Sequence, residues 1–191
     1  MKTSTRRVIT LSLLGASTFA LAACEPEEKV DATITTSAEA CVAEGGDVAT
    51  CEKDFAAALA IHQETAPRYD ALAVCEEEHG AGNCEEKAHA AASGGSSFMP
   101  FFMGYMMGNI LSNNGNTVGA RVTPKPLYSV AAGGYSSADG AIQSKVLGGK
   151  ASVGVSAFKA PPSTVSLAPM TKATVASRGG FSTARGVSSG G

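Results

Sequence analysis

The stretch Ser96–Asn114 reads SSFMPFFMGYMMGNILSNN and, with the first 23 residues, holds most of the large apolar side chains. It contains four of the six methionines and three of the seven phenylalanines. Ser96 or Ser97 can cap a helix, and Pro100 suits a first helical turn. We therefore predict a Met/Phe/Gly-rich apolar helix over residues 93–112.

This helix is too short to cross a membrane. Its apolar run, Phe98–Leu111, would extend about 20 Å at 1.5 Å per residue, whereas the hydrocarbon core of a bilayer is roughly 30 Å thick. Gly104 and Gly108 form a small-xxx-small notch through which two helices can approach closely. The stretch therefore predicts a helix that packs on the rest of the chain or docks a partner or the lipid surface. Its proposed contact residues are Phe98, Met99, Phe102, Met103, Gly104, Met106, Met107 and Gly108.

The methionines allow a second interpretation. Thioethers favour Cu(I), so Met99, Met103, Met106 and Met107 could be ligands of a copper ion. Methionine is also a common filler of adaptable apolar surfaces, and this explanation suits a segment so rich in phenylalanine. The sequence therefore favours a core or interface over a metal site.

The N-terminus has the pattern of a lipoprotein signal peptide over residues 1–23. Lys2, Arg6 and Arg7 precede an apolar run, and Leu21–Cys24 resembles the lipobox of bacterial lipoproteins. This resemblance implies that Cys24 is lipidated and becomes the first mature residue. The sequence thus predicts a lipid-anchored protein of the cell envelope. Because residue 25 is not aspartate, the outer membrane is favoured over the inner membrane.

The other cysteines suggest disulfides. Cys41, Cys51, Cys75 and Cys84 are an even number in an oxidising compartment. Four cysteines allow three pairings, and the glycines within each local loop favour Cys41 with Cys51 and Cys75 with Cys84.

Charge divides the mature chain into two parts. Residues 24–111 carry 16 acidic and 4 basic residues, whereas residues 112–191 carry 8 basic residues and one acidic residue. This asymmetry suggests that the basic part meets an anionic envelope polymer or folds back on the acidic part. Gly, Ser, Ala, Thr and Pro dominate residues 113–191, and we predict a disordered tail there.

The region between the signal and the apolar stretch predicts helices. Residues 24–36 form a polar tether, and residues 37–92 form a small disulfide-stapled helical domain. Its main helix starts after an N-cap at Asp47 and stops before Pro67, with His62 on its buried stripe. The expected fold is therefore mainly α, with one apolar helix and a disordered tail.

The residue types offer little for catalysis. His62, His79 and His89 are the only bases that titrate near neutral pH, and no nucleophile elbow, phosphate-binding loop or carboxylate pair accompanies them. We expect neither an enzyme nor a cofactor, and the envelope location argues against nucleic acid as a partner.

Several motifs together resemble the YgiB family of proteobacterial envelope proteins. They are the lipobox, the paired cysteines, Ala66-Pro67-Arg68-Tyr69, the MP-x-x-MGYMMG block of residues 99–108, and Arg178-Gly-Gly-Phe181. The resemblance implies an envelope lipoprotein without an assigned activity and supplies no catalytic residues. We therefore expect a lipid-anchored protein with a structural or protein-interaction role, through an envelope partner or self-association. The alternative is a periplasmic copper-binding or redox-linked module that uses the Met-rich segment.

Overall fold

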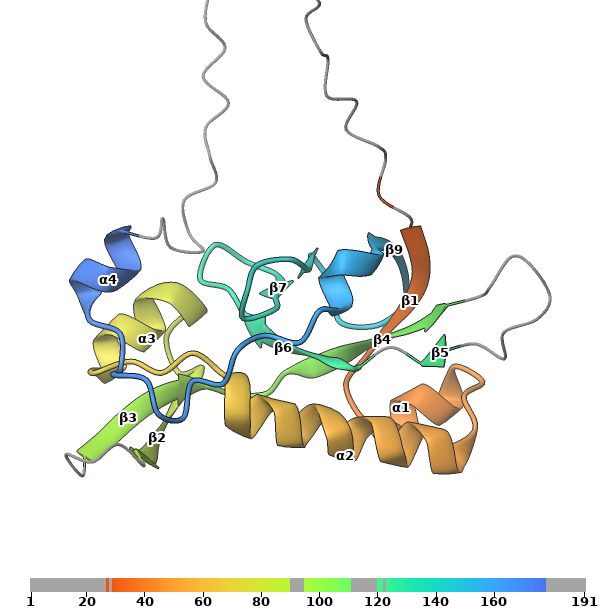
Figure 1. Ribbon diagram of the computed structural model, residues 1–191, viewed down its shortest axis with the longest axis horizontal. Coiled ribbons are helices and arrows are strands. Elements are labelled where there is room, and N and C mark those ends of the chain that lie inside the picture. The colour runs from red at the N-terminus through yellow and green to blue at the C-terminus, as the bar shows by residue number, and fades with distance from the viewer. Residues whose placement is uncertain (1–26, 28, 90–94, 111–119, 122, 178–191) are drawn as a thin grey trace, which may run out of the picture.

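A curled antiparallel sheet forms the centre of the protein in a computed structural model that describes residues 27, 29–89, 95–110, 120–121 and 123–177 (Figure 1). Its strands are β1 (Lys29–Thr35), β4 (Gly104–Ile110), β5 (Ala120–Arg121), β6 (Lys125–Ser129), β7 (Tyr135–Ser136), β8 (Gln143–Ser144) and β9 (Lys150–Gly154). They follow the order β8-β7-β6-β4-β1-β9, and β5 pairs with the end of β4. The prediction of a mainly α fold is therefore wrong.

The expected polar tether contains strand β1, which lies inside the sheet. Val30, Ala32 and Ile34 are buried, whereas Lys29 and Asp31 are exposed. This alternation is the period of a half-buried strand. β1 pairs with β4 on one side and β9 on the other, so a segment that looked like a linker is a central strand.

The apolar stretch forms two strands and not a helix. β3 (Gly95–Pro100) pairs with β2 (Cys84–His89) in a separate two-stranded sheet, and β4 pairs with β1, β5 and β6. A continuous apolar run fits a buried strand as well as a buried helix. The aromatic residues favour strands, and each glycine costs a helix about 1 kcal/mol. Hydrogen bonding to strands on both sides of β4 makes this segment a strand and not a helix.

Much of the basic tail is folded. In β6, Leu127 lies opposite Gly104 of β4, and β9 pairs with β1 along five residues, Lys150–Gly154. The predicted disorder of residues 113–191 is therefore wrong for the described residues 120–121 and 123–177. Single apolar residues are enough to order these strands, because the sheet that they join also contains strands of the acidic part.

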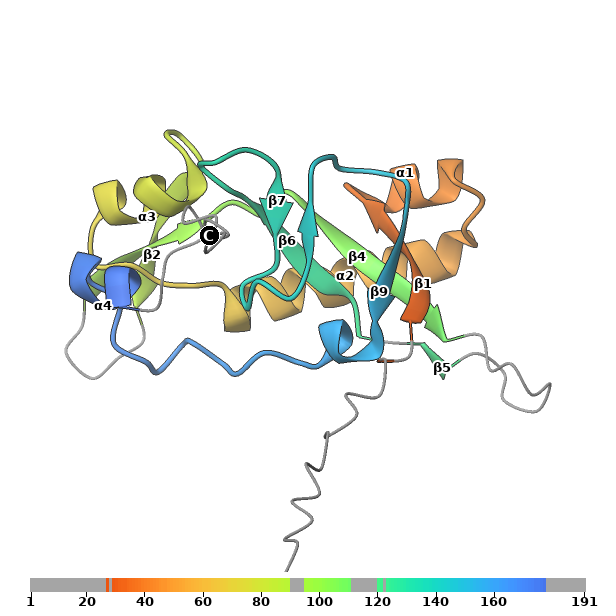
Figure 2. The same ribbon diagram turned by 90° about the horizontal axis from the view of Figure 1, so that it is seen from above.

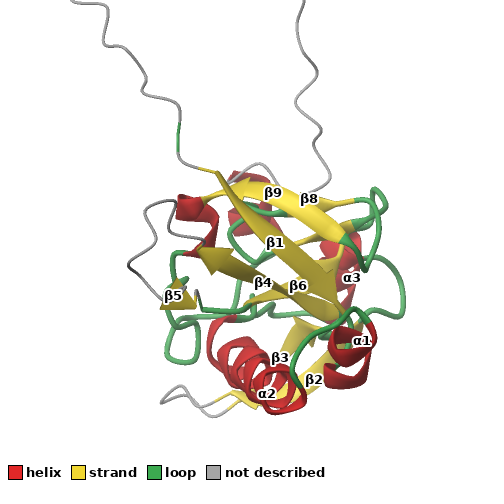
Figure 3. Ribbon diagram, turned by 90° about the vertical axis from the view of Figure 1, so that its right-hand side faces the viewer, coloured by secondary structure: helices red, strands yellow, loops and turns green. Residues whose placement is uncertain are grey.

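The helices pack on the two sheets. They are α1 (Ala38–Ala43), α2 (Val48–Thr65), α3 (Leu72–His79), the 3-10 turn η1 (Val155–Phe158) and α4 (Lys172–Ser177). α2 lies against one face of the main sheet (Figure 3). It begins after Asp47, whose carboxylate accepts the Thr50 N–H at 3.0 Å, as the sequence predicts. The cap at Ala66 comes directly before Pro67 and ends the helix.

Both favoured cysteine pairings are confirmed. Cys41 and Cys51 join α1 to α2 across a Cα–Cα distance of 5.7 Å, and Cys75 and Cys84 join α3 to β2 across 6.3 Å. In the chain-entropy model a bridge over a loop of this length contributes roughly 3 kcal/mol. The first disulfide therefore ties two helices together, and the second ties a helix to a strand.

The main core lies within the curled sheet and under η1. Its buried members are Val30, Ala32, Ile34, Met106, Leu127, Ile142, Ala157 and Phe158. Both charge halves of the chain contribute, so neither forms this core alone. Within the described ranges, no helix has the length and hydropathy needed to cross a bilayer.

Candidate functional site

A pocket of about 280 Å³ opens beside the C-terminal end of α2. Its apolar wall consists of Pro67, Ala138, Pro161, Pro162, Leu167, Ala168 and Met170. Thr65, Arg68, Asp139 and Thr164 add polar groups. Proline side chains are stiff and offer no backbone N–H, so the wall is preformed and poor in donors.

The outer wall is the segment between η1 and α4, which runs along one edge of the molecule toward α3 (Figure 2). Thr164 fixes its middle, because its N–H donates to the Glu64 carbonyl at 2.8 Å and its hydroxyl to the Ala66 carbonyl at 2.7 Å. Met170 fixes its end by donating its N–H to the Arg68 carbonyl at 2.7 Å. The segment is thus tied to the chain that follows α2.

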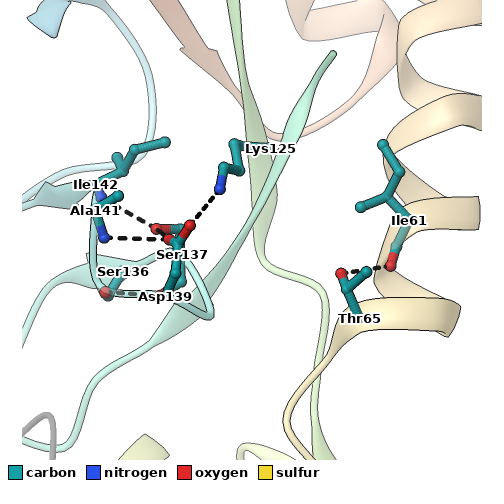
Figure 4. A network of polar contacts seen from close by, with 8 residues as sticks. All are labelled: Ile61, Thr65, Lys125, Ser136, Ser137, Asp139, Ala141 and Ile142. Carbon is teal, nitrogen blue, oxygen red and sulfur yellow. Dashed lines mark hydrogen bonds and ion pairs between the residues drawn. The ribbon is translucent and has the colours of Figure 1, made fainter. Parts of the chain in front are cut away.

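An ion pair closes the opposite side of the pocket. Lys125 of β6 donates from Nζ to Asp139 Oδ2 at 2.5 Å, and the Ser137 hydroxyl donates to Asp139 Oδ1 at 2.6 Å (Figure 4). The Lys125 side chain is only 3% exposed, whereas that of Asp139 is 34% exposed. Burial raises the pKa of Asp139, but hydrogen bonds from Lys125, Ser137 and the Ala141 N–H outweigh this effect, so the pKa is lowered overall. The pair therefore remains charged and holds the 137–142 loop against β6.

Arg68 brings a second buried cation to the pocket. It is 8% exposed, and its Nη2 donates to the Gln63 carbonyl at 2.9 Å. Its Nη1 lies 3.5 Å from Ser97 Oγ, and its Nε makes no hydrogen bond within the described part of the chain. The guanidinium thus holds the end of α2 to β3 through neutral partners.

The predicted base His62 is buried and does not line the pocket. His62 Nδ1 lies 3.4 Å from the Tyr128 hydroxyl, and burial lowers the pKa of His62 to about 4. Burial also raises the pKa of Tyr128 above its usual range. The prediction that His62 is a satisfied core histidine agrees with this geometry. His89 ends β2, and its side chain lies outside the described residues.

His79 belongs to a second buried network at the end of α3. The Tyr69 hydroxyl lies 2.5 Å from Glu78 Oε2 and 2.8 Å from His79 Nε2. His79 Nδ1 lies 2.8 Å from the Ser129 carbonyl oxygen of β6. All three side chains have exposures of 2% or less, so this network is sealed within the protein.

A third buried group lies under α2. Tyr105 packs against Phe55 and Phe102, with ring centroids 5.9 and 6.4 Å away. Its hydroxyl has no hydrogen-bond partner among the described residues, and burial raises its pKa to about 12. This aromatic group is a packing contact, and Tyr105 does not line the pocket.

The residues proposed for an interaction helix are dispersed by the strands. Met99 packs with Ala66 and Tyr128, whereas Met106 lies in the main core. Met107 contacts the first disulfide, with its Sδ 4.0 Å from Cys41 Sγ. Met99 and Met106 are fully buried, so they cannot present a docking surface.

The same dispersal separates the proposed copper ligands. Met99, Met106 and Met107 belong to three different clusters. Among the described residues no group of three His, Cys, Asp or Glu side chains is placed to hold a metal ion. Three of the four proposed methionine ligands therefore do not share a cluster, and the lipidation residue Cys24 lies outside the described residues.

A family model of proteins of unknown function, DUF1190, matches residues 29–190. The chain belongs to the DUF1190 family. This is the YgiB family that the sequence motifs indicate, so that resemblance is confirmed. No solved structure matches the chain. The DUF1190 match covers both the acidic part and the basic part, which the fold joins in one sheet.

Sequence reasoning missed this pocket. Its apolar residues come from three separate segments, at Pro67, at Ala138 and between Pro161 and Met170. One local signal was present, because Pro161 and Pro162 are adjacent in a tail otherwise rich in small residues. Nothing in the linear order indicates that this pair faces the end of α2.

Proposed function

We propose that this protein is a lipid-anchored, non-catalytic binding protein of the cell envelope. Its pocket receives an apolar side chain from a basic segment of another envelope protein. The preformed apolar pocket is the observation that carries this proposal. The lipobox supports the anchoring, and the outer membrane is the favoured site.

The position of β1 suits such an anchor. Five residue steps separate Cys24 from Lys29, and at roughly 3.5 Å per residue they reach about 17 Å at most. β1 begins on the side of the molecule opposite α2 (Figure 1). An acylated Cys24 would keep that side near the bilayer and leave α2 facing away from it.

The pocket size suits one side chain. Small-molecule sites usually start near 300 Å³, and this pocket is slightly smaller at about 280 Å³. Proline, leucine and methionine groups provide apolar contact, whereas the polar atoms of Asp139 and Thr164 are engaged with the protein itself. These contacts favour an apolar occupant, beside Arg68, whose Nε has no hydrogen-bond partner among the described residues.

Acidic residues lie beside the segment that forms the outer wall of the pocket. Glu64 and Asp70 are exposed and directly adjoin the segment that forms the outer wall, through hydrogen bonds to Thr164 and Met170. Residues 24–111 carry a formal charge of −12, from 16 acidic and 4 basic residues. A basic partner segment would be attracted to this border, mainly through its association rate and with a dependence on salt.

A peptide titration tests both parts of the recognition. The mature chain, with Cys24→Ser to remove the lipid, is titrated with the acetylated and amidated peptide Lys-Lys-Leu-Lys-Lys. We expect NMR shifts at Leu167 and Met170. Replacing the leucine of the peptide with serine should abolish them, and replacing its lysines with glutamates should weaken binding at least tenfold.

Matched variants locate the binding. Ala168 is exposed and lines the pocket, so Ala168→Trp fills the pocket without disturbing the core. Ala60 is exposed on α2, away from the residues that line the pocket, so Ala60→Trp is the control. Loss of the shifts in the first variant alone supports the proposal. Equal binding of the serine peptide, or shifts that persist in Ala168→Trp, refutes it.

The anchor has its own test. Intact mass of the protein from fractionated envelopes should begin at an acylated Cys24 and should show four alkylation sites only after reduction. A chain without lipid would contradict the anchoring and leave the peptide result standing.

A further inference from the structure

In the network at the end of α3, two titratable side chains lie within hydrogen-bond distance of one hydroxyl. Tyr69 Oη is 2.5 Å from Glu78 Oε2 and 2.8 Å from His79 Nε2. The other ring nitrogen of His79 faces the Ser129 carbonyl at 2.8 Å. A carbonyl oxygen only accepts, so Nδ1 must carry a hydrogen.

The single hydrogen of the Tyr69 hydroxyl then fixes the proton count. If Tyr69 donates to the Glu78 carboxylate, His79 Nε2 must donate to Tyr69, and the ring is an imidazolium. If Tyr69 donates to His79, Glu78 must donate to Tyr69, and it is a carboxylic acid. Both arrangements hold one proton on the Glu78 and His79 pair, in addition to those on Tyr69 Oη and His79 Nδ1.

We propose that Tyr69, Glu78 and His79 form a single-proton site that fastens α3 to β6. Removing the proton leaves one O–H between two acceptors. Adding a second makes both neighbours donors to Tyr69 Oη, so that the Tyr69 O–H no longer has an acceptor in this network. Either change leaves a polar group unmatched among side chains that are at most 2% exposed. Losing a buried hydrogen bond is costly, so the folded protein resists both changes.

Glu78 and His79 are the last two residues of α3, where the helix dipole stabilises a cation and disfavours a carboxylate. The dipole therefore does not decide between the two arrangements. The first has a charged ring and a carboxylate, and the second has both groups neutral. Transfer of two hydrogens through Tyr69 connects the charged form to the neutral one without any change in the number of protons bound.

Other charged groups near the network come from the neighbouring elements. On α2, His62 is separated from His79 by the Tyr128 ring of β6, whose centroid is 5.7 Å from the first ring and 6.0 Å from the second. Arg68 precedes Tyr69 and donates to Gln63.

The remaining charges face the surface. On α3, Glu77 forms an exposed ion pair with Lys172 of α4 at 2.9 Å, and Glu76 accepts the Gly82 N–H at 2.8 Å. Asp70, which follows Tyr69, is exposed. These groups lie in water, where their effect on the buried site is screened.

The pH dependence of unfolding tests the proposal. In the unfolded chain Glu78 loses its proton near pH 4.3 and His79 near pH 6.5. Above about pH 6.5 the folded protein holds one proton more than the unfolded chain, so stability falls as pH rises. The unfolding equilibrium constant should increase tenfold per pH unit from this site.

Glu78→Gln removes the proton requirement and keeps the shape. Its amide donates to Tyr69, Tyr69 donates to neutral His79, and His79 donates to Ser129, so every contact is satisfied without an extra proton. We expect this variant to lack the tenfold dependence between pH 7 and 9 that the unmodified protein and the Glu77→Gln control show. Parallel slopes for the protein and Glu78→Gln would overturn the proposal, whatever the absolute stability of the variant.

NMR of the folded protein provides a second, independent measurement. At pH 7.5, nitrogen shifts of the His79 ring and the carboxyl shift of Glu78 report which group is protonated. A protonated His79 Nε2 or a protonated Glu78 supports the single-proton site. Deprotonation of both groups at that pH refutes it.

Discussion

Replacing Gly104 with alanine tests the strand assignment of the apolar stretch. A Cβ on Gly104 would lie 2.6 Å from the Thr35 carbonyl oxygen and 3.3 Å from the Thr36 Cα, both backbone atoms. Ordinary contact begins at 3.4 Å, so β1 and β4 would have to separate by about 0.8 Å at this point. No side-chain rotation can relieve that overlap.

The expected cost follows from this separation. A hydrogen bond of about 2.9 Å stretched by ~0.8 Å leaves the accepted range, and each lost bond costs ~1 kcal/mol. Overpacking of the neighbouring residues adds 1 kcal/mol or more. We expect Gly104→Ala to lower the free energy of unfolding by about 2–4 kcal/mol. In a helix the same change would raise stability by up to about 1 kcal/mol, so the two structures predict opposite signs.

Urea unfolding followed by circular dichroism, with both disulfides intact, measures this difference. Gly95→Ala is the matched control, because Gly95 lies in β3 and a Cβ there meets no atom within 4 Å. We expect the control to change stability by less than about 0.5 kcal/mol. If Gly104→Ala is as stable as the control or more stable, the pairing of β1 with β4 at this position is wrong.

Three further changes give distinct expected results. Tyr105→Phe should leave stability unchanged or raise it by about 1 kcal/mol, because the lost hydroxyl is buried without a partner among the described residues. Tyr69→Phe should instead cost about 2–3 kcal/mol, because it breaks two contacts. Thermal melts of both variants compare the two losses, and an equal loss would contradict this prediction. Asp139→Ala should cost about 3 kcal/mol, because it leaves the buried ammonium of Lys125 unpaired. The double variant Lys125→Met with Asp139→Ala should recover much of that loss in urea titrations. A double variant no more stable than the single one would refute the explanation. Burial lowers the pKa of His62 in the folded protein to about 4. Its contribution to stability, about 3 kcal/mol, is therefore present above pH 6.5 and is lost as pH falls toward 4. His62→Phe should remove this part of the acid dependence of the melting temperature, and an unchanged acid profile would show that the ring is not held neutral.

Local signals in the sequence determined helix α2 and the two disulfides. Asp47 and Pro67 mark the two ends of α2 because a cap and a helix breaker act on the adjacent backbone. The two disulfide pairings followed from short loops that contain glycine. The family followed from a specific block of residues, 99–108, together with the cysteine pattern.

Predictions failed where a segment depends on distant partners. The stretch around Gly104 is apolar in every direction, so its sequence period could not separate a strand from a helix. The pairing of β4 with β1, far earlier in the sequence, and with β6, which follows it, decides that it is extended. Likewise the tail lacks a local core, and its strand β9 is ordered by β1, more than 100 residues earlier.

The buried sites show the same division between sequence and tertiary structure. Residue types alone gave His62 its place on a buried stripe, because helical spacing is a local property. The approach of Tyr69 to Glu78 and His79, and of Asp139 to Lys125, required the folded chain. A hydrogen bond or ion pair of this kind depends on distances of about 3 Å, and only packing between separate elements sets those distances.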